Sequence, residues 1–282
     1  MTEDLTMRLL HGDALERLKE LPDNSIDSVV TDPPYGLSKE PNIEEVLTKW
    51  ISGEPYDHGH GGFMGKSWDS FVPHPELWKE VHRVLKPGGH ALVFAGTRTQ
   101  DLMTIALRLA GFEVRDVIEW LYFTGFPKSH DISKAFDKKE NPVYAKKWNG
   151  WGTSLKPAHE PIIMVRKPID STVVDNVERH GVGGINVDEC RVPFGEEEDL
   201  EKLAQRTGGI GNTKFANSVL TSEAKRSAYK PKGSGRFPAN CITLDDNQSY
   251  SKFFNITPQE LSKKSSKKDR NSDWQGNEIE VG

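Results

Sequence analysis

The chain has 282 residues and a mass of 31.7 kDa; 35 % of its residues are hydrophobic and 28 % are charged, which is typical of a soluble globular protein. No run approaches the ~18 consecutive apolar residues of a membrane span, and the acidic N-terminus (MTED) is unlike a signal peptide. Two cysteines, Cys190 and Cys241, are too few for a disulfide scaffold or a four-ligand zinc site. Secretion, membrane insertion and a cysteine-rich metal module are therefore excluded, and a cytoplasmic location is expected.

The net charge of −5 is unevenly distributed along the chain. Residues 202–270 contain fourteen Lys or Arg and five Asp or Glu, so this segment carries +9 and the remainder −14. A cationic segment in an acidic protein indicates a polyanionic partner. A solvated, poorly ordered segment has the same composition, so both interpretations stay open at this point.

Predicted strands and helices alternate in the first half of the chain. Short apolar or β-branched runs bounded by turn residues predict strands at residues 7–11, 26–31, 91–95, 112–122 and 161–165. Apolar residues at helical spacing predict helices over 14–18, 75–85 and 102–109. This order predicts an α/β fold with a mostly parallel sheet covered by helices. Residues 36–75 are expected to form a long loop over an active face.

Asp32-Pro33-Pro34-Tyr35 follows the predicted strand 26–31 directly. A carboxylate, two stiff prolines and an aromatic ring at the carboxyl end of a strand lie where open α/β sheets bind their ligands. An ordinary proline-rich turn is the alternative for this string taken alone. Its placement after a buried strand favours a functional site.

The sequence resembles the amino-group DNA methyltransferases of the β arrangement, in which D-P-P-Y lies near the N-terminus. The resemblance extends over roughly residues 7–245 and rests on several blocks in the family's order: HGDALERLKELPDNSIDSVVTDPPYG, FMGKSWD, RVLKPGGHALVFAGTRT, GFPKSHDISKA, GWGTSLKPAHEPI and GRFPAN. It implies a Rossmann-like sheet with an inserted target-recognition region. The sheet is expected to be incomplete at its C-terminal part. The implied domains are a catalytic half over 1–124, a recognition region over 125–240 with one returning strand near 161–165, and a basic tail or the start of the missing cofactor-binding part over 241–282.

The implied reaction moves a methyl group from S-adenosylmethionine to an exocyclic amino group of a base flipped out of double-stranded DNA. Adenine N6 is expected rather than cytosine N4, because the Asp of D-P-P-Y resembles the adenine-specific subset. The catalytic residues are then Asp32, Pro33, Pro34 and Tyr35. The Asp32 carboxylate and the Pro33 carbonyl would accept hydrogen bonds from the amino group, and Tyr35 would stack on the base. No metal is expected.

Cofactor contacts are expected from Asp13, Asp32, Phe94, Gly96 and Thr97, which follow predicted strands. For Asp13 the alternative is the N-cap of a helix, and for residues 94–97 it is plain loop packing. Trp68 and Lys156 lie in recognisable blocks without an assigned role.

The sequence departs from the family at one place. The family binds S-adenosylmethionine partly through a D-P-F-x-G-S-G loop after the recognition region, and these 282 residues contain none. Gly208-Gly209-Ile210-Gly211 follows no predicted strand and is a poor substitute. The expectation is therefore a truncated or split enzyme, with a second chain supplying the loop in the split case. The alternative is a DNA-binding protein without methyl transfer of its own. RNA or protein methylation is disfavoured, because related proteins place the loop before D-P-P-Y.

Overall fold

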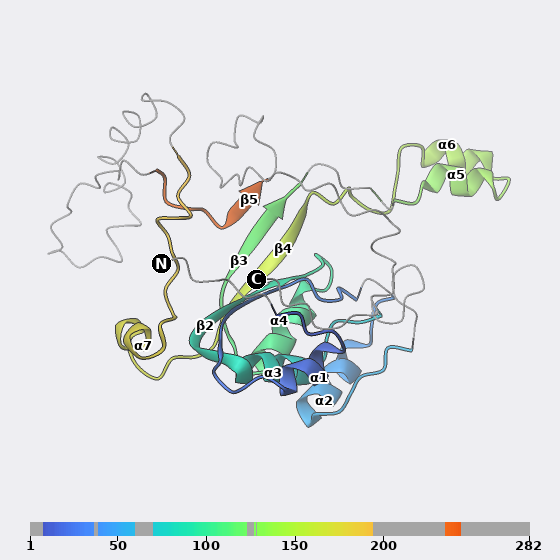
Figure 1. Cartoon of the computed structure of the whole chain (residues 1–282). Helices are drawn as coiled ribbons and strands as arrows, with labels where there is room; N and C mark the ends of the chain where they lie inside the picture. The colour runs from blue at the N-terminus through green and yellow to red at the C-terminus, as the bar shows by residue number, and fades with distance from the viewer. Residues whose placement is uncertain are drawn as a thin grey trace, which may run out of the picture. The chain divides into compact units, whose positions relative to one another are not determined.

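The computed structural model describes residues 8–36, 39–59, 70–122, 127, 129–193 and 235–243. Its elements in chain order (Figure 1) are α1 Ala14–Lys19, β1 Ile26–Thr31, α2 Ile43–Ser52, α3 Pro75–Val84, β2 Leu85–Phe94, α4 Gln100–Leu109, β3 Glu113–Leu121, α5 Ile132–Asp137, α6 Pro142–Lys147, β4 His159–Arg166, α7 Val173–His180 and β5 Cys241–Thr243. Within these ranges no helix is both long and apolar enough to cross a membrane.

Five strands form one sheet in the order β1-β2-β4-β3-β5, which confirms the predicted α/β class. Strands β1 and β2 are parallel, as are β3 and β5, whereas β2 and β4 are antiparallel. The sheet is therefore mixed: the pairings β1–β2 and β3–β5 are parallel as expected, and the antiparallel pairing of β2 with β4 is a departure from that expectation. The apolar pattern of a buried strand shows that it is a strand but not in which direction it runs, so the reversal at β4 could not be predicted.

Four of the five predicted strands are present; the strand at 26–31 has its predicted ends, and the other three have shifted ends. The strand expected at 91–95 begins at Leu85 and includes the Lys-Pro-Gly-Gly run, where Gly88 has a positive φ of 82° and the pairing with β1 shifts register. The strand expected at 7–11 was wrong for its described part, because residues 8–11 are not a strand. Those residues have no strand partner within the described ranges, and an apolar run without a partner cannot form a ladder.

The predicted loop over 36–75 contains helix α2, so this expectation was also wrong in part. Val46 and Trp50, four residues apart, are buried on one face of α2. Asn42 begins the helix by accepting a hydrogen bond from the Glu45 amide at 3.4 Å, and Gly53 ends it in the left-handed conformation. The apolar face of α2 is the reason why this Gly- and Pro-rich stretch is ordered here.

The chain forms two compact units. Among the described residues, the first unit contains 8–118 and 161–191, and the second contains 119–160 and 192–243. The second unit includes the pairing of β3 with β5 and an antiparallel bridge between Val192 and Arg236. Its sequence limits differ from those of the expected recognition region, whose boundaries stay a prediction.

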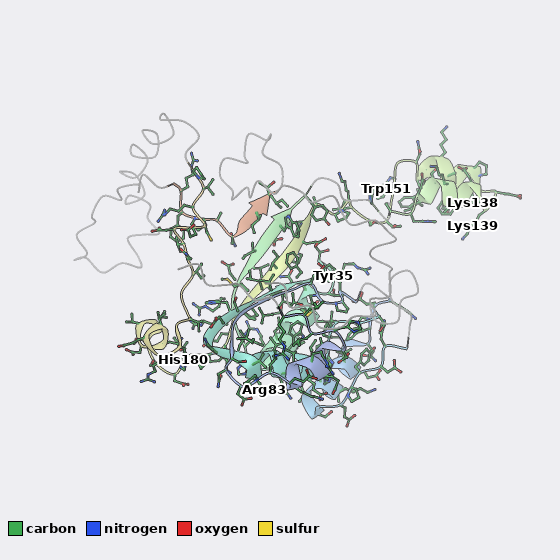
Figure 2. The ribbon with its side chains drawn as sticks, in the orientation of Figure 1. Tyr35, Arg83, Lys138, Lys139, Trp151 and His180 are labelled. Carbon is green, nitrogen blue, oxygen red and sulfur yellow. The ribbon has the colours of Figure 1, made fainter. Side chains whose placement is uncertain are left out.

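Arg83 at the end of α3 fixes the turn that leads into β1 (Figure 2). Its guanidinium donates to the carbonyls of Leu18 and Leu21, both at 2.9 Å, and pairs with Asp23 and Glu80. Hydrogen bonds from one planar fork to several acceptors hold a chain segment in a single geometry. The start of β1, and with it the segment that follows β1, is positioned in this way.

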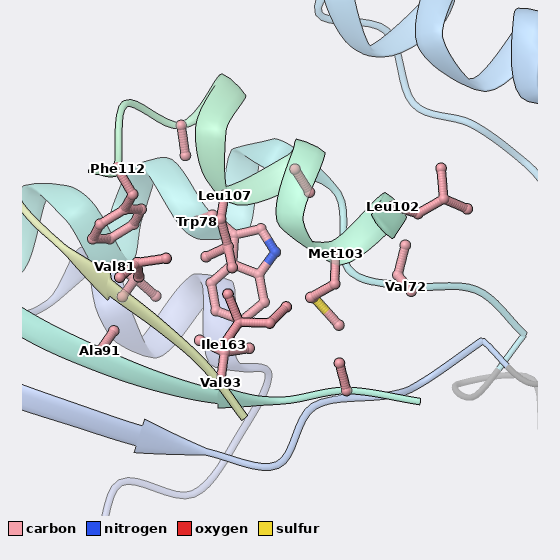
Figure 3. Close-up of a cluster of buried hydrophobic side chains, with 14 of the residues drawn as sticks. Val72, Trp78, Val81, Ala91, Val93, Leu102, Met103, Leu107, Phe112 and Ile163 are labelled. Carbon is pink, nitrogen blue, oxygen red and sulfur yellow. The ribbon is translucent and has the colours of Figure 1, made fainter. Parts of the chain in front are cut away.

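The core of the first unit lies between one face of the sheet and helices α2, α3 and α4 (Figure 3). Trp78 of α3 and Leu107 of α4 are at most 1 % exposed and pack with Val93 of β2 and Ile163 of β4. Burying a side chain of this size stabilises a fold by roughly 1.5–3 kcal/mol. The carboxyl ends of β1 and β2 are thereby held on a rigid base.

Candidate active site

The carboxyl ends of two neighbouring parallel strands form the candidate site. Strand β1 ends at Thr31, which is in register with Val93 of β2. The segment Asp32–Gly36 follows β1, and the segment 95–99 (AGTRT) follows β2. In open α/β sheets ligands bind outside such carboxyl ends, so the structure places the predicted D-P-P-Y residues where a ligand site is expected.

Thr99 joins the two segments. Its hydroxyl donates a hydrogen bond of 2.5 Å to the backbone carbonyl of Tyr35, and its side chain is only 7 % exposed. A buried hydrogen bond of this kind costs about 1–3 kcal/mol to break when the acceptor is left without a partner. Thr99 therefore positions the D-P-P-Y turn, a role that the sequence analysis did not assign to it.

Gly36 closes the turn in a conformation that only glycine adopts readily. Its φ is +66°, and a Cβ at this position would lie 2.8 Å from the Val72 amide nitrogen and 3.0 Å from backbone atoms of Phe71. The turn is thus packed directly against the segment before α3. The ring of Phe71 in turn contacts Tyr56 and His58, with ring centroids 4.9 and 5.3 Å apart.

A cavity of about 250 Å³ lies beside this turn. Its lining includes Gly36, residues 39–41, and three residues of the segment after β2 and the start of α4: Arg98, Thr99 and Asp101. Charged groups of both signs and the turn backbone therefore face one small space beside the D-P-P-Y segment, together with the apolar side chains of Ile43 and Leu102.

The two predicted hydrogen-bond acceptors are both available at this site. Asp32 is exposed, and no donor among the described residues binds its carboxylate. The same holds for the carbonyl of Pro33, whereas the carbonyl of Tyr35 is used by Thr99. Among the described residues, the Asp32 carboxylate and the Pro33 carbonyl thus have no donor, whereas the Tyr35 carbonyl, two residues after Pro33, holds the shape of the turn.

The predicted cofactor residues divide into two groups. Phe94, Gly96 and Thr97 end β2 or follow it, next to the D-P-P-Y segment, and Thr97 is exposed. Asp13 instead accepts hydrogen bonds from the amides of Leu15 and Glu16 at 3.0 and 3.3 Å and is the N-cap of α1. This is the alternative considered for Asp13; a contact with the cofactor stays a prediction.

Several predicted features lie outside the described residues. They include Trp68 with its sequence block, the run 208–211, and the basic segment 202–270 except for 235–243. Lys156 is described and exposed. Among the described residues no group of three His, Cys, Asp or Glu side chains is arranged to hold a metal ion.

The profile of the DNA methylase family (N6_N4_Mtase) matches residues 26–272, most of the chain. This chain belongs to the DNA methylase family. The Rossmann-like class and S-adenosylmethionine as the methyl donor, both implied by the resemblance, are confirmed by this membership. The match begins at the first residue of β1 and includes the D-P-P-Y segment and the segment after β2.

The chain is also similar to individual methyltransferases. Over 261 residues the chain is 26 % identical to the type II methyltransferase M.HindIII of Haemophilus influenzae, an alignment that covers 84 % of this chain and 81 % of that protein. It is 29 % identical over 115 residues to the DNA adenine methyltransferase YhdJ of Escherichia coli, covering 40 % of this chain and 33 % of YhdJ. Among solved structures, the cytosine-N4-specific PvuII DNA methyltransferase is 18 % identical, with a TM-score of 0.31 and coverages of 58 % and 50 %.

Proposed function

We propose that this DNA methylase transfers a methyl group to the N6 amino group of an adenine flipped out of double-stranded DNA. The observation that carries the proposal is the pair of available acceptors at the end of β1, the Asp32 carboxylate and the Pro33 carbonyl. An exocyclic amino group presents two hydrogens, and these two acceptors match them in number and in chemistry.

The chemistry explains why two acceptors are needed. The lone pair of an exocyclic amino group is delocalised into the ring, so the nitrogen is a poor nucleophile. Acceptors aimed at both hydrogens favour a pyramidal nitrogen and return the lone pair to it. Asp32 and Pro33 act as these acceptors, and the ring of Tyr35 stacks on the base once it has left the duplex. Thr99 keeps the turn in place through its bond to the Tyr35 carbonyl.

The residues after β2 would hold the methyl donor. The half-buried ring of Phe94 offers an apolar face, and the exposed hydroxyl of Thr97 offers a polar group at the same end of the sheet. Gly96 between them is buried, and its carbonyl accepts a hydrogen bond from the Thr99 amide at 3.1 Å. These groups suit a ligand with an aromatic base and a polar chain, such as S-adenosylmethionine. When bound, this cofactor supplies an electrophilic methyl group on a sulfonium.

Adenine is favoured over cytosine for two reasons. The motif carries Asp in its first position, and one relative over part of the chain, YhdJ, is an adenine methyltransferase. The DNA substrate itself follows from the family. A DNA-binding chain that needs a second polypeptide for cofactor binding is the alternative, and it shares every feature of the D-P-P-Y site.

The test is to incubate the chain with duplex DNA of mixed sequence and S-adenosylmethionine carrying a deuterated methyl group, at up to millimolar concentration. The DNA is then hydrolysed to nucleosides, which are separated and identified by mass spectrometry. Labelled N6-methyladenine is the expected product; labelled N4-methylcytosine would overturn the choice of base. If the chain alone gives neither, a polypeptide carrying a D-P-F-x-G-S-G loop is added, and failure of that mixture as well would contradict methyl transfer.

A further inference from the structure

The second unit carries a helix pair, α5–α6, whose geometry is fixed by contacts within the pair. The Ser133 hydroxyl donates to the carbonyl of Ala145 at 2.9 Å, and the rings of Phe136 and Tyr144 lie 5.3 Å apart. Each helix has only six residues, and isolated helices of that length are marginal in water. The contacts between the two helices therefore define the surface that they present.

This surface is rich in lysine. Residues 129–156 contain six lysines and three acidic residues, although the chain as a whole has a net charge of −5. All six lysines are exposed: Lys134, Lys138, Lys139, Lys146, Lys147 and Lys156. Asp131 pairs with Lys134, and the Lys134 amide holds the pKa of Asp131 below its usual value. No carboxylate of the described residues pairs with the other four lysines of the helix pair, residues 138, 139, 146 and 147.

Exposed aromatic rings lie among these lysines. Trp148 and Trp151 meet edge to face with centroids 5.0 Å apart, and Trp151 is 59 % exposed. The Lys147 ammonium lies 5.8 Å from the centre of the Trp148 ring and 5.9 Å from that of Tyr144. Figure 2 shows Lys138 and Lys139 on the helix pair and Trp151 on the segment that leaves it. Exposed lysines alone are typical of a solvated surface, but an exposed tryptophan among them is not. The combination therefore indicates a ligand that has both negative charge and aromatic rings.

The segment that carries Trp151 is held in shape by its own hydrogen bonds. Ser129 accepts from the amides of Thr153 and Ser154 at 3.0 and 3.3 Å, and the Thr153 hydroxyl accepts from the His130 amide at 2.9 Å. Ser129, Thr153 and Ser154 line an open cavity of about 680 Å³, and its wall also contains Asp131, Trp151 and Leu155. Leu155 is 92 % exposed. Among the described residues, the wall has an aromatic ring and one carboxylate and no lysine, so this cavity suits a stacked base better than a phosphate, which the lysines of the helix pair would contact.

We propose that the α5–α6 surface, defined as Lys138, Lys139, Lys146, Lys147 and Trp151, binds the DNA substrate. The four lysines contact phosphates, and Trp151 stacks on an unpaired base. Lysines that neutralise phosphates release counterions, and aromatic faces stack on any base that is out of its duplex. The inference rests on the proposed function, which requires a DNA substrate in which one base pair is opened.

The test measures DNA affinity of the full chain by fluorescence anisotropy over a series of salt concentrations. In one variant all four lysines become glutamine, and in the matched control all four become arginine, which keeps the charge. The glutamine variant is expected to flatten the log–log salt slope by about 3–4, since each phosphate contact contributes about 0.9. The arginine variant is expected to keep the slope of the parent chain.

A second variant separates stacking from charge. Trp151→Ala is expected to weaken binding to single-stranded DNA by about 10-fold with an unchanged salt slope, and Trp151→Phe to restore most of it. Unchanged affinity and slope in the glutamine variant would overturn the lysine part of the proposal, and unchanged single-strand affinity in Trp151→Ala would overturn the stacking part. Circular dichroism checks that each variant is folded; if the fourfold glutamine variant is not, the double change K138Q/K139Q replaces it, with an expected slope change of about 2.

Failure of this inference is distinguishable from failure of the proposed function. If the parent chain methylates DNA and the lysine variants bind it as the parent does, the surface is not the DNA contact but the methyl transfer stands. If the parent neither binds nor methylates DNA, even after a polypeptide carrying a D-P-F-x-G-S-G loop is added, the proposed function itself fails.

Discussion

Replacing Gly36 by alanine should disturb the D-P-P-Y turn more than the same change at Gly53, although both glycines have positive φ angles, +66° and +77°. The left-handed conformation costs an alanine about 1–2 kcal/mol at either position. At Gly53 no described atom lies within 4 Å of the added Cβ, so the free energy of unfolding should fall by that amount alone.

At Gly36 the added Cβ would also lie 2.8 Å from the Val72 nitrogen. Ordinary contact begins at 3.4 Å, so backbone must move by about 0.6 Å, at an overpacking cost of about 1–3 kcal/mol. The summed loss for Gly36→Ala is then about 2–5 kcal/mol. Because a 1 Å misplacement of reacting groups can cost about 10²-fold in rate, a 10-fold or larger loss of methyl transfer is expected.

The assay compares thermal unfolding and initial methylation rates of the parent, Gly36→Ala and Gly53→Ala at the same DNA occupancy. Gly53→Ala should keep the rate of the parent within a few-fold, because α2 only ends there. Equal unfolding temperatures and equal rates for the two variants would refute the reasoning that the contact between Gly36 and Val72 positions the turn.

Three further outcomes are expected. Thr99→Val should lower the methylation rate about 10-fold through the lost bond to Tyr35, with little change in DNA affinity, and Thr99→Ser should restore it; equal rates for the two variants would exclude positioning by this hydroxyl. Burial, and to a smaller extent the charge of Lys167, lowers the pKa of His82 in the folded chain from its ordinary 6.5. The contribution of neutral His82 to the free energy of unfolding is therefore complete above pH 6.5 and is lost as the pH falls below 6.5. In urea unfolding at several pH values, the free energy of unfolding should fall less steeply with decreasing pH for His82→Asn than for the parent. The 282-residue chain should bind S-adenosylmethionine with a Kd of about 0.1–1 mM, because its sequence contains no D-P-F-x-G-S-G loop, and a micromolar Kd by calorimetry would show that other residues replace this loop.

The position of the D-P-P-Y segment could be predicted because two local signals agree. The β-branched run Ile26–Thr31 predicts a strand that ends where Asp32 and its prolines begin, as the structure confirms. The expectation that this strand is buried was wrong, because none of its residues is fully buried and Val30 is 69 % exposed. The contact of Thr99 with Tyr35 could not be predicted, since it joins a side chain to a backbone carbonyl 64 residues away. Neither periodicity nor composition predicts a hydrogen bond between residues so far apart in the sequence.

Other parts of the fold were missed for different physical reasons. Helices α5 and α6 were missed because each has only six residues, less than two turns, within a stretch rich in Gly, Lys and Asn; helix α1 is as short, but its sequence Ala-Leu-Glu-Arg-Leu was recognised as helical. Helix α2 was missed because it lies in a stretch rich in Gly and Pro, which predicts a loop. Its two buried residues, Val46 and Trp50, are too few to show a helical apolar pattern there. The antiparallel direction of β4 depends on its route through the fold and not on its own residues.

The most direct test of the account is the effect of Asp32→Ala on methyl transfer and on DNA binding, measured side by side. The account predicts that the rate falls by about 10²-fold or more, with duplex affinity within a few-fold of the parent, because an acceptor that acts in the transition state is lost. The size-matched change Asp32→Asn should also slow the reaction, since an amide is a weaker acceptor than a carboxylate. A rate for Asp32→Ala equal to that of the parent would contradict the role of this carboxylate and with it the proposed mechanism.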